Sequence, residues 1–200
     1  MESTKTRILK KLLETDGYLS GQELCEQLGV SRTAVWKYMK QLKEEGYEIE
    51  AVQNKGYCLK DVPDVLGESE IKSRLHTRWA GQTLYYYDGI DSTNTQIKRL
   101  AEEDAPHGTL AVADYQSRGK GRRGRAWDSP HGSAIYMSIL FRPEIRPDRA
   151  SMLTLVIGLS VTQAIRSNLG LQAQIKWPND VVLNGKKLVG ILTEMSAQMN

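Results

Sequence analysis

A loop rich in glycine and arginine is the stretch of this sequence whose residue types and spacing most suggest chemistry. Residues 119–125 read GKGRRGR and follow the strand-like segment TLAVADYQ. The spacing G-x-G-x-x-G matches a dinucleotide fingerprint, but that motif must turn from a strand directly into a helix. The following residues, AWDSPHG, predict no helix, and the loop lacks the G-K-[ST] ending of a P-loop. Both nucleotide-binding folds are therefore excluded.

The charge of this loop favours an anionic ligand. Residues 118–125 contain five cations and no acid: Arg118, Lys120, Arg122, Arg123 and Arg125. Glycines let a backbone fold over a ligand, and the planar fork of arginine suits phosphate. Trp127 offers a flat surface for a purine base. A solvated charged loop explains the same composition equally well, so the residues alone leave both interpretations open.

A second acid-free cluster of cations lies near the N-terminus, within a pattern typical of a helix-turn-helix. Apolar spacing predicts helices over 4–14, 21–28 and 32–46, with Ser20–Glu23 as a capping box and Ser31 as a cap. Gly29 supplies the turn, and Cys25 is the small residue where the helices approach closely. The expected inward positions are Leu24, Leu28, Val30, Val35 and Tyr38. YEIEAV and GYCLK flank QNKG and predict a hairpin that forms a wing.

The outward face of the third helix is suited to a DNA groove. It presents Ser31, Arg32, Thr33, Trp36, Lys37 and Lys40. These side chains can reach phosphates and base edges, so we favour DNA binding over a module that binds protein or packs on its neighbour. Trp36 has an alternative place, packed against the wing.

The remaining chain predicts a linker followed by a larger α+β domain. The predicted boundaries are 1–62 for a winged helix-turn-helix domain, 63–70 for a linker and 71–200 for the larger domain. Helices are predicted at 69–75, where the helix is capped, at 93–103, with Thr93 and Gln96 as a capping box, and at 148–170, where the helix is mostly buried. Strands are predicted at 83–88, 109–116, 133–141 and 173–177. A hairpin is predicted at 181–195, with its turn at Asn184-Gly185. Strands grouped in hairpins indicate a mixed sheet.

Composition limits the class of protein. With 40% apolar and 26% charged residues and a net charge of +3, the 200-residue chain is typical of a soluble globular protein. It has no basic-then-apolar leader and no apolar run long enough for a membrane span, so we expect a cytoplasmic location. Cys25 and Cys58 lack a nearby cysteine partner and are expected to be small buried hydrophobes. No metal ligand is predicted.

Four motifs resemble the motif blocks of biotin protein ligases, in the same order. They are DSTN (91–94), Gln116-x-x-GKGRRGR-x-W, KWPND (176–180) and GKKLVGIL (185–192). With the winged helix in front, essentially the whole chain is similar to the bifunctional biotin protein ligase/biotin operon repressor family. Lys120 replaces the usual arginine, and Ala126 replaces a frequently basic residue. The family continues through further strands and a small C-terminal barrel, so we expect an incomplete catalytic domain here.

This resemblance implies an activity and a role for particular residues. The family activates biotin with ATP as biotinyl-5′-adenylate, transfers it to a lysine of a biotin carboxyl carrier protein, and represses biotin genes. The implied biotin-binding residues are Ser92, Thr93, Asn94, Gln116, Lys120, Gly121, Arg122 and Lys187. The implied nucleotide-binding residues are Arg122, Arg125, Trp127 and Asn179, and the implied catalytic residues are Lys187, Arg122 and Asp180, the last organising Mg²⁺ or the incoming lysine.

The expected ligands and partners are therefore biotin, ATP with Mg²⁺, the carrier protein and operator DNA, with a homodimer also considered and no membrane. Two alternatives stay open: a monofunctional ligase with a vestigial winged helix, and a metabolite-sensing regulator without catalysis. Single residues have alternatives too. In these alternatives Ser92 and Thr93 would only cap a helix, KWPND would be a plain turn, and Lys187 would be a surface charge. The apolar neighbours Leu188, Val189 and Ile191 favour a buried hairpin around Lys187.

Overall fold

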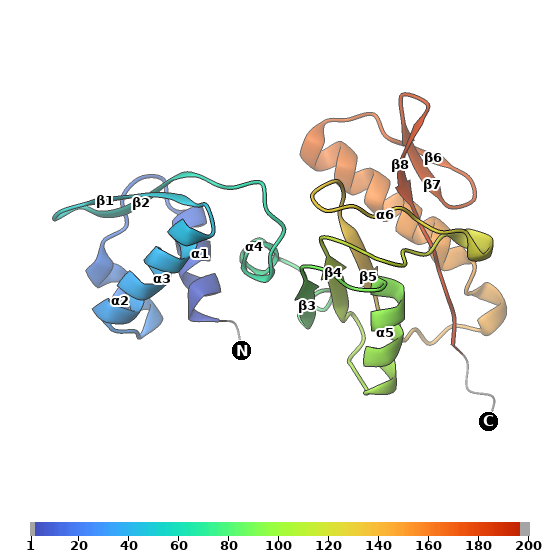
Figure 1. The fold of residues 1–200 in the computed structure, drawn as a ribbon, viewed down its shortest axis with the longest axis horizontal. Helices are drawn as coiled ribbons and strands as arrows, with labels where there is room; N and C mark the ends of the chain where they lie inside the picture. Colours follow the sequence, from blue (N-terminus) through green and yellow to red (C-terminus); the bar gives the residue numbers. More distant parts are fainter. Residues whose placement is uncertain (1–2, 197–200) are drawn as a thin grey trace. The chain divides into compact units, whose positions relative to one another are not determined.

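A computed structural model describes residues 3–196. The chain divides into two compact units, one made of the residues up to 117 together with 129–141, the other of 118–128 together with the residues from 142 onward. Figure 1 shows the order of the helices and strands within each unit. Among residues 3–196, no helix combines the length and apolar character that crossing a bilayer requires.

The N-terminal part forms the predicted winged helix-turn-helix. It contains α1 (Thr4–Glu14), α2 (Gly21–Leu28) and α3 (Arg32–Glu44), followed by the hairpin of β1 (Glu48–Val52) and β2 (Gly56–Asp61). The hydroxyls of Ser20 and Ser31 accept hydrogen bonds from the N–H groups of Glu23 and Ala34, as expected of N-caps. Gly29 ends α2 in the left-handed conformation, with φ of 66°, which allows the tight turn into α3.

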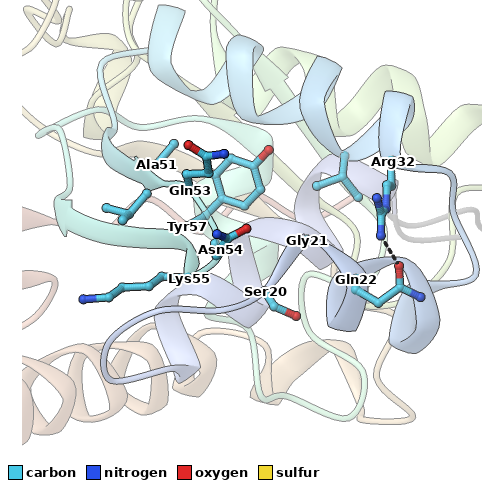
Figure 2. A pocket seen from close by; sticks show the side chains of 12 residues that line it. Ser20, Gly21, Gln22, Arg32, Ala51, Gln53, Asn54, Lys55 and Tyr57 are labelled. Atoms are coloured by element: carbon cyan, nitrogen blue, oxygen red, sulfur yellow. Dashed lines mark hydrogen bonds between the residues drawn. The ribbon is translucent and has the colours of Figure 1, made fainter.

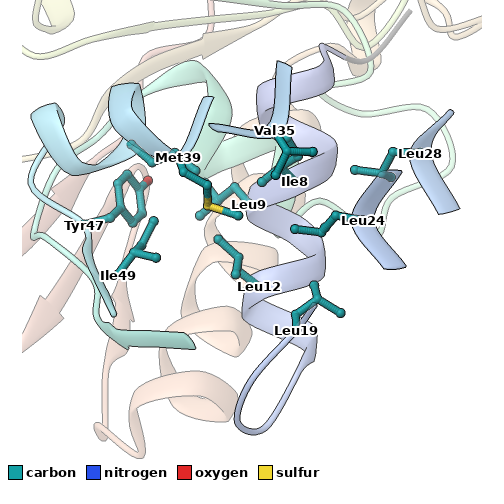
Figure 3. Packing of buried hydrophobic residues seen from close by; sticks show 11 residues of the cluster. Ile8, Leu9, Leu12, Leu19, Leu24, Leu28, Val35, Met39, Tyr47 and Ile49 are labelled. Atoms are coloured by element: carbon teal, nitrogen blue, oxygen red, sulfur yellow. The ribbon is translucent and has the colours of Figure 1, made fainter. Parts of the chain in front are cut away.

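The three helices and the first strand bury one apolar core (Figure 3). Its buried members are Ile8, Leu9, Leu12, Leu19, Leu24, Leu28, Val35, Met39, Leu42, Tyr47 and Ile49. The predicted inward positions Leu24, Leu28 and Val35 are confirmed, while Val30 and Tyr38 are only partly buried. On α3 the residues four and seven positions after Val35 lie on the same face as Val35. Met39 and Leu42 therefore occupy the inward position that was predicted for Tyr38.

The wing is held close to the start of α2 by backbone contacts. Val52 pairs with Gly56, and Leu19 and Tyr57 exchange two backbone hydrogen bonds of 2.8 and 2.9 Å. Gly56 has φ of +111°, and a Cβ at this position would lie 2.2 Å from the carbonyl oxygen of Leu19. Only glycine therefore permits this approach of the wing to the loop before α2.

Helix α4 (Glu68–Ser73) begins inside the segment predicted as a linker. Its N-cap, Gly67, makes no side-chain hydrogen bond, so the predicted capped helix at 69–75 starts earlier and without a cap. The hydroxyl of Tyr47 donates a 2.6 Å hydrogen bond to Glu70, and burial together with this carboxylate raises the pKa of Tyr47. α4 also packs on α1, where the Thr6 and Ser69 hydroxyl oxygens lie 3.4 Å apart. These contacts fix α4 on the winged module.

A mixed three-stranded sheet follows. Its order is β3 (Leu84–Tyr87), β4 (Leu110–Ala113) and β5 (Tyr136–Ile139), with β3 parallel to β4 and β4 antiparallel to β5. Helix α5 (Thr93–Glu102) connects the parallel pair and packs on β4 and β5. Ile97 and Leu100 of α5 form a small core with Ala105 and Ala111. The predicted mixed α+β architecture is confirmed.

The second unit contains one long helix and an antiparallel sheet. Helix α6 (Met152–Leu169) precedes β6 (Gln174–Lys176), β7 (Asp180–Leu183) and β8 (Lys186–Gly190). Short 3₁₀ turns lie at Arg122–Gly124 and Pro147–Arg149. Asn184 and Gly185 have φ of 51° and 76°, the left-handed values that the predicted Asn-Gly hairpin turn requires.

The prediction that α6 is mostly buried was wrong. Its side chains Ile157, Val161 and Ile165 pack on Val181 and Ile191, but Met152, Leu155, Val156 and Leu159 are exposed. The expectation of a buried hairpin around Lys187 was also wrong, since Lys187 is exposed and Leu188 is 47% exposed. An apolar helix is buried all round only if elements cover every side, and among residues 3–196 the small sheet covers one.

Replacing Gly56 by alanine should destabilise the winged module by more than about 2 kcal/mol, because it adds a backbone clash to an unfavourable φ. Gly17→Ala is the matched control, since Gly17 has φ of +104° but open space around its Cβ position. The control should cost only about 1–2 kcal/mol. Urea unfolding followed by far-UV circular dichroism measures both. Equal losses in the two variants would contradict the close approach of the wing.

Candidate active site

The first cluster of candidate residues is a buried polar network around Gln116. The Oε1 atom of Gln116 accepts hydrogen bonds from the N–H of Thr93 at 2.8 Å and from its hydroxyl at 3.1 Å. The Nε2 atom donates to the hydroxyl of Ser129 at 2.9 Å. Thr93, Gln116 and Ser129 are all buried, as is the neighbouring Ser92. The amide of Gln116 is thus held at both ends and has one orientation.

Ser138 extends this network to Asn94. Its hydroxyl oxygen lies 2.6 Å from Asn94 Oδ1 and 2.9 Å from Thr93 Oγ1, so one hydroxyl hydrogen serves two acceptors. The predicted residues Ser92, Thr93, Asn94 and Gln116 therefore lie together at the start of α5. Ser129 and Ser138 were not predicted, although a serine inside the otherwise apolar strand YMSI is a usable signal.

The capping box expected at Thr93 and Gln96 is not formed. Ser92 is the N-cap of α5, and its side chain makes no capping hydrogen bond. Thr93 is the first helical residue and uses its hydroxyl on Gln116, while Gln96 donates to the hydroxyl of Tyr87 at 3.0 Å. Thr93 and Gln96 therefore bond to residues distant in sequence and do not cap the helix. Ser92 makes no capping hydrogen bond either, so helix capping explains neither the Ser92 nor the Thr93 hydroxyl.

Asp91 anchors the segment that carries these residues. Its Oδ2 atom lies 2.7 Å from Nη2 of Arg99 in α5, and its Oδ1 atom accepts the N–H of Ser92 at 2.8 Å. The hydrogen bonds from Arg99 hold the pKa of Asp91 below its usual range. The ion pair therefore fixes the turn that leads into α5.

The second cluster joins Lys187, Asp180 and Trp127. The Nζ atom of Lys187 lies 2.7 Å from Asp180 Oδ1 and 4.8 Å from the centre of the Trp127 ring. Apart from this ion pair, the buried Oδ1 atom has no hydrogen-bond partner among residues 3–196. A Cβ on Gly190 would lie 3.0 Å from Trp127 and 3.1 Å from Lys187, so glycine leaves room for both side chains.

The glycine-rich loop folds as a small hairpin beside this cluster. The N–H of Gly121 donates to the carbonyl of Arg125 at 2.7 Å, and that of Trp127 to Gly119 at 2.9 Å. Its tip is a left-handed turn at Arg123 and Gly124, with φ of 58° and 72°. The sequence analysis expected a glycine-containing backbone that can fold over a ligand, and it did not predict this backbone pairing.

One arginine of the loop is held by a neutral amide. Arg122 Nη1 donates to Asn179 Oδ1 at 2.9 Å, and Asn179 Nδ2 donates to the carbonyl of Ile191 at 3.2 Å. Lys120 and Arg125 are exposed. Arg122, Trp127, Asn179, Asp180 and Lys187 thus lie together in one compact unit, while Ser92, Thr93, Asn94 and Gln116 lie in the other.

The six side chains predicted to face DNA are all exposed on α3 or at its cap. Trp36 is 60% exposed, so the alternative that it packs against the wing is wrong. Arg32 donates to Gln22 at 2.9 Å, and Lys40 forms a loose 3.7 Å ion pair with Glu44. Among residues 3–196, no three histidine, cysteine or acidic side chains lie close enough to hold a metal ion.

The Asp91–Arg99 pair predicts a pH dependence of stability. Because the pKa of Asp91 is lower in the folded state, the pair stabilises the fold above the unfolded pKa of about 4, and this contribution is lost as pH falls through the folded value. Asp91→Asn should therefore cost about 0.5–1 kcal/mol at neutral pH and nothing in strong acid, since the pair is partly exposed. Urea unfolding at several pH values tests this. Glu102→Gln is the control, and an Asp91→Asn loss that persists in acid would refute the assignment.

Comparison with known proteins gives the family. A sequence model of the biotin/lipoate A/B protein ligase family matches residues 86–199, and an HTH domain model matches residues 4–58. The bifunctional ligase/repressor BirA of Bacillus subtilis is 47% identical over 99% of this chain, and that of Escherichia coli is 36% identical over 94%. The chain spans 62% and 57% of the lengths of these relatives.

A solved structure supports the same relationship. The biotin protein ligase from Aquifex aeolicus, in complex with biotin and ATP, is 39% identical and superimposes with a TM-score of 0.51 over 57% of this chain and 47% of its own. With 114 residues of a 200-residue chain matched by the family model, the assignment covers more than half of the sequence. The chain belongs to the biotin/lipoate A/B protein ligase family and has an HTH domain in front of its ligase segment.

Proposed function

We propose that this protein is an ATP-dependent ligase that activates biotin as biotinyl-5′-adenylate and transfers it to a lysine of a biotin carboxyl carrier protein. We also propose that residues 1–62 bind operator DNA and repress biotin genes, and that residues 71–200 contribute to the catalytic domain. The observation that carries the ligase proposal is the Lys187–Asp180 pair beside Trp127 and the arginine loop, within the family segment. The relatives named ligase/repressor support the combination.

The chemistry requires activation because a carboxylate has no good leaving group that an attacking amine could displace. Biotin's carboxylate oxygen attacks the α-phosphorus of ATP and pyrophosphate leaves, which forms the acyl-adenylate. The amine of the acceptor lysine then attacks the acyl carbon, and AMP leaves. Reactions at phosphorus depend mainly on positioning and on neutralising charge, which is what a cluster of cations supplies.

Lys187 and Arg122 are the proposed catalytic cations. Both are held by a neighbour, Lys187 by Asp180 at 2.7 Å and Arg122 by Asn179 at 2.9 Å, so both are oriented before substrates bind. Lys187 would neutralise the biotin carboxylate and then the α-phosphate. Arg122, Arg125 and Asn179 would bind the phosphates, and Trp127 would stack on adenine. Lys120 and Gly121 would close over the ligand.

The polar network around Gln116 is the proposed site for the ureido ring of biotin. A ureido group is uncharged and carries donors and an acceptor, so it calls for hydroxyls and amides. Both lone pairs of Gln116 Oε1 are used by Thr93, and one hydrogen of Nε2 by Ser129. The second Nε2 hydrogen would serve the ligand's carbonyl, while Ser92, Thr93 and Asn94 provide the remaining polar atoms.

The residues present fit a Mg²⁺ ion that arrives with ATP. Mg²⁺ in ATP sites is held mainly by phosphates and water with one or two carboxylates. Asp180 is a carboxylate in this cluster, and no wider group of metal ligands lies among residues 3–196. Asp180 would hold the ion, which would supply charge neutralisation at the phosphates.

A cytoplasmic location follows from the proposed use of ATP and operator DNA, and a homodimer stays a prediction.

Replacing Lys187 by alanine should slow adenylation about 10²-fold or more, because a cation at the developing phosphate charge contributes a few kcal/mol. Biotin-dependent exchange of pyrophosphate into ATP measures this step alone. Lys186→Ala is the matched control, since Lys186 is the adjacent exposed lysine of β8. Near-normal exchange in Lys187→Ala would contradict its role, and no exchange in the unaltered protein would contradict the ligase proposal.

Removing Lys37 or Lys40 should lower the salt slope of log K for duplex DNA by about 0.9 each, because each lysine that contacts a phosphate releases condensed counterions. Fluorescence anisotropy with a labelled duplex, titrated at several salt concentrations, gives the slope. Lys10→Ala, a charge loss on α1, is the control. Unchanged affinity and slope in both Lys37→Ala and Lys40→Ala would mean that α3 does not lie in the groove.

A further inference from the structure

Two polar features of the N-terminal unit lie outside the biotin and nucleotide sites proposed above. One is a groove of about 480 Å³ beside the wing, where Arg32 donates to Gln22 at 2.9 Å (Figure 2). Because Arg32 is one of the side chains predicted to face DNA, this groove belongs to the proposed DNA-binding surface. The other feature is the pair of Asp114 and His131, to which the proposed function gives no role.

The carboxylate of Asp114 holds the segment 129–132, which follows the glycine-rich loop. Its Oδ2 atom lies 2.8 Å from Nδ1 of His131, and its Oδ1 atom accepts the N–H of Gly132 at 3.1 Å. The ring of His131 stacks on that of Tyr115, with the ring centres 4.7 Å apart. Since Asp114 directly follows β4, these contacts tie the segment to the end of that strand.

The same segment is also held from β5. The hydroxyl of Tyr136 donates to the carbonyl of Pro130 at 3.1 Å, and the hydroxyl of Ser133 donates to that carbonyl at 3.0 Å. Tyr136 pairs in the sheet with Ala113, the residue before Asp114. The segment is therefore fixed from both strands, at the point where β4 ends and β5 begins.

Ser129, the first residue of this segment, holds Gln116 in two ways. Its carbonyl accepts the N–H of Gln116 at 3.1 Å, and its hydroxyl accepts a hydrogen bond from Nε2 at 2.9 Å. Both residues are buried, whereas the side chains of Asp114 and His131 are 29% and 65% exposed. An ion pair as exposed as this one contributes little to stability. What the pair provides is the position of the segment that carries Ser129.

We propose that Asp114 is a positioning residue for biotin. It holds His131 and Gly132, and the segment to which they belong fixes Ser129. Ser129 in turn directs the second Nε2 hydrogen of Gln116 toward the ureido carbonyl of the ligand. A hydrogen bond weakens steeply when its angle is wrong, so the direction of this amide affects affinity. The proposal rests on the biotin site proposed above and adds a residue that acts through Ser129.

Isothermal titration calorimetry of the full chain with biotin alone tests this without requiring catalysis. Asp114→Ala should raise the Kd for biotin about fivefold, which corresponds to the loss of one hydrogen bond, and should leave the fraction of protein that binds unchanged. Asp114→Asn should keep the Kd within about twofold, because its amide offers an oxygen to Gly132 and an N–H to the His131 ring. Glu102→Ala removes an exposed carboxylate of α5 and is the matched control, with an unchanged Kd.

A double-variant cycle tests the route from Asp114 to Gln116. Ser129→Ala alone should also weaken biotin binding, because it removes the acceptor of Gln116 Nε2. If Asp114 acts through Ser129, adding Asp114→Ala to Ser129→Ala should raise the Kd by less than Asp114→Ala does alone. Independent effects, in which the two Kd factors multiply, would overturn the proposed route.

The outcomes separate this proposal from the function that it extends. If the unaltered protein binds no biotin, the proposed function fails and this proposal fails with it. If it binds biotin and Asp114→Ala has the same Kd, the biotin site stands and the positioning role does not. A smaller binding fraction with an unchanged Kd would show that Asp114 only stabilises the fold.

Two further results would overturn the positioning role while leaving the biotin site in place. An equal rise of the Kd in Glu102→Ala would show a general effect of charge. A Kd in Asp114→Asn as high as in Asp114→Ala would show that the geometry of these hydrogen bonds is not what Asp114 provides.

Discussion

A cation that is to bind an anionic ligand must be oriented before the ligand arrives, and each candidate site depends on the neighbour that holds its cation in place. Lys187 is held by the carboxylate of Asp180, Arg122 by the amide of Asn179 and Arg32 by the amide of Gln22. An amide orients a guanidinium without cancelling its charge, so Arg122 and Arg32 keep their attraction for phosphate. The same arrangement occurs in the ligase segment and in the winged module, which supports anion binding in both.

A second requirement of the structure is that certain groups approach a backbone segment closely, and glycine permits this at two places. Gly190 leaves space where Trp127 and Lys187 meet, and Gly56 lets the wing pair with Leu19. A methyl group would displace Trp127 and Lys187 at the first position and the backbone of Leu19 at the second. Such positions explain why the spacing of glycines, as well as the charged residues, determines the geometry of each candidate site.

Local signals predicted the elements well and their partners less well. The serine caps of α2 and α3 and the Asn184-Gly185 turn depend on neighbours in the chain, and the sequence was sufficient for them. The partner of Thr93 is Gln116, twenty-three residues away, so a local capping box was the wrong expectation. The prediction that α6 is mostly buried was wrong because the exposure of a helix depends on which distant elements cover it. Motif resemblance suggested the candidate site residues, but it could not suggest Ser129 or Ser138, which no quoted motif contains.

The ion pair of Lys187 and Asp180 has a consequence for any reaction at this cluster. If Lys187 turns from Asp180 to the carboxylate or phosphate of a substrate, the buried Oδ1 atom of Asp180 loses its one polar contact among residues 3–196. A buried carboxylate without a partner is costly, so a cation must take the place of the lysine. In the proposed first step, Mg²⁺ is the cation that would enter with the substrates, since it arrives with ATP. If Asp180 held this ion, Lys187 would be free for the substrate, and Asp180 would have a role beyond holding a lysine in place.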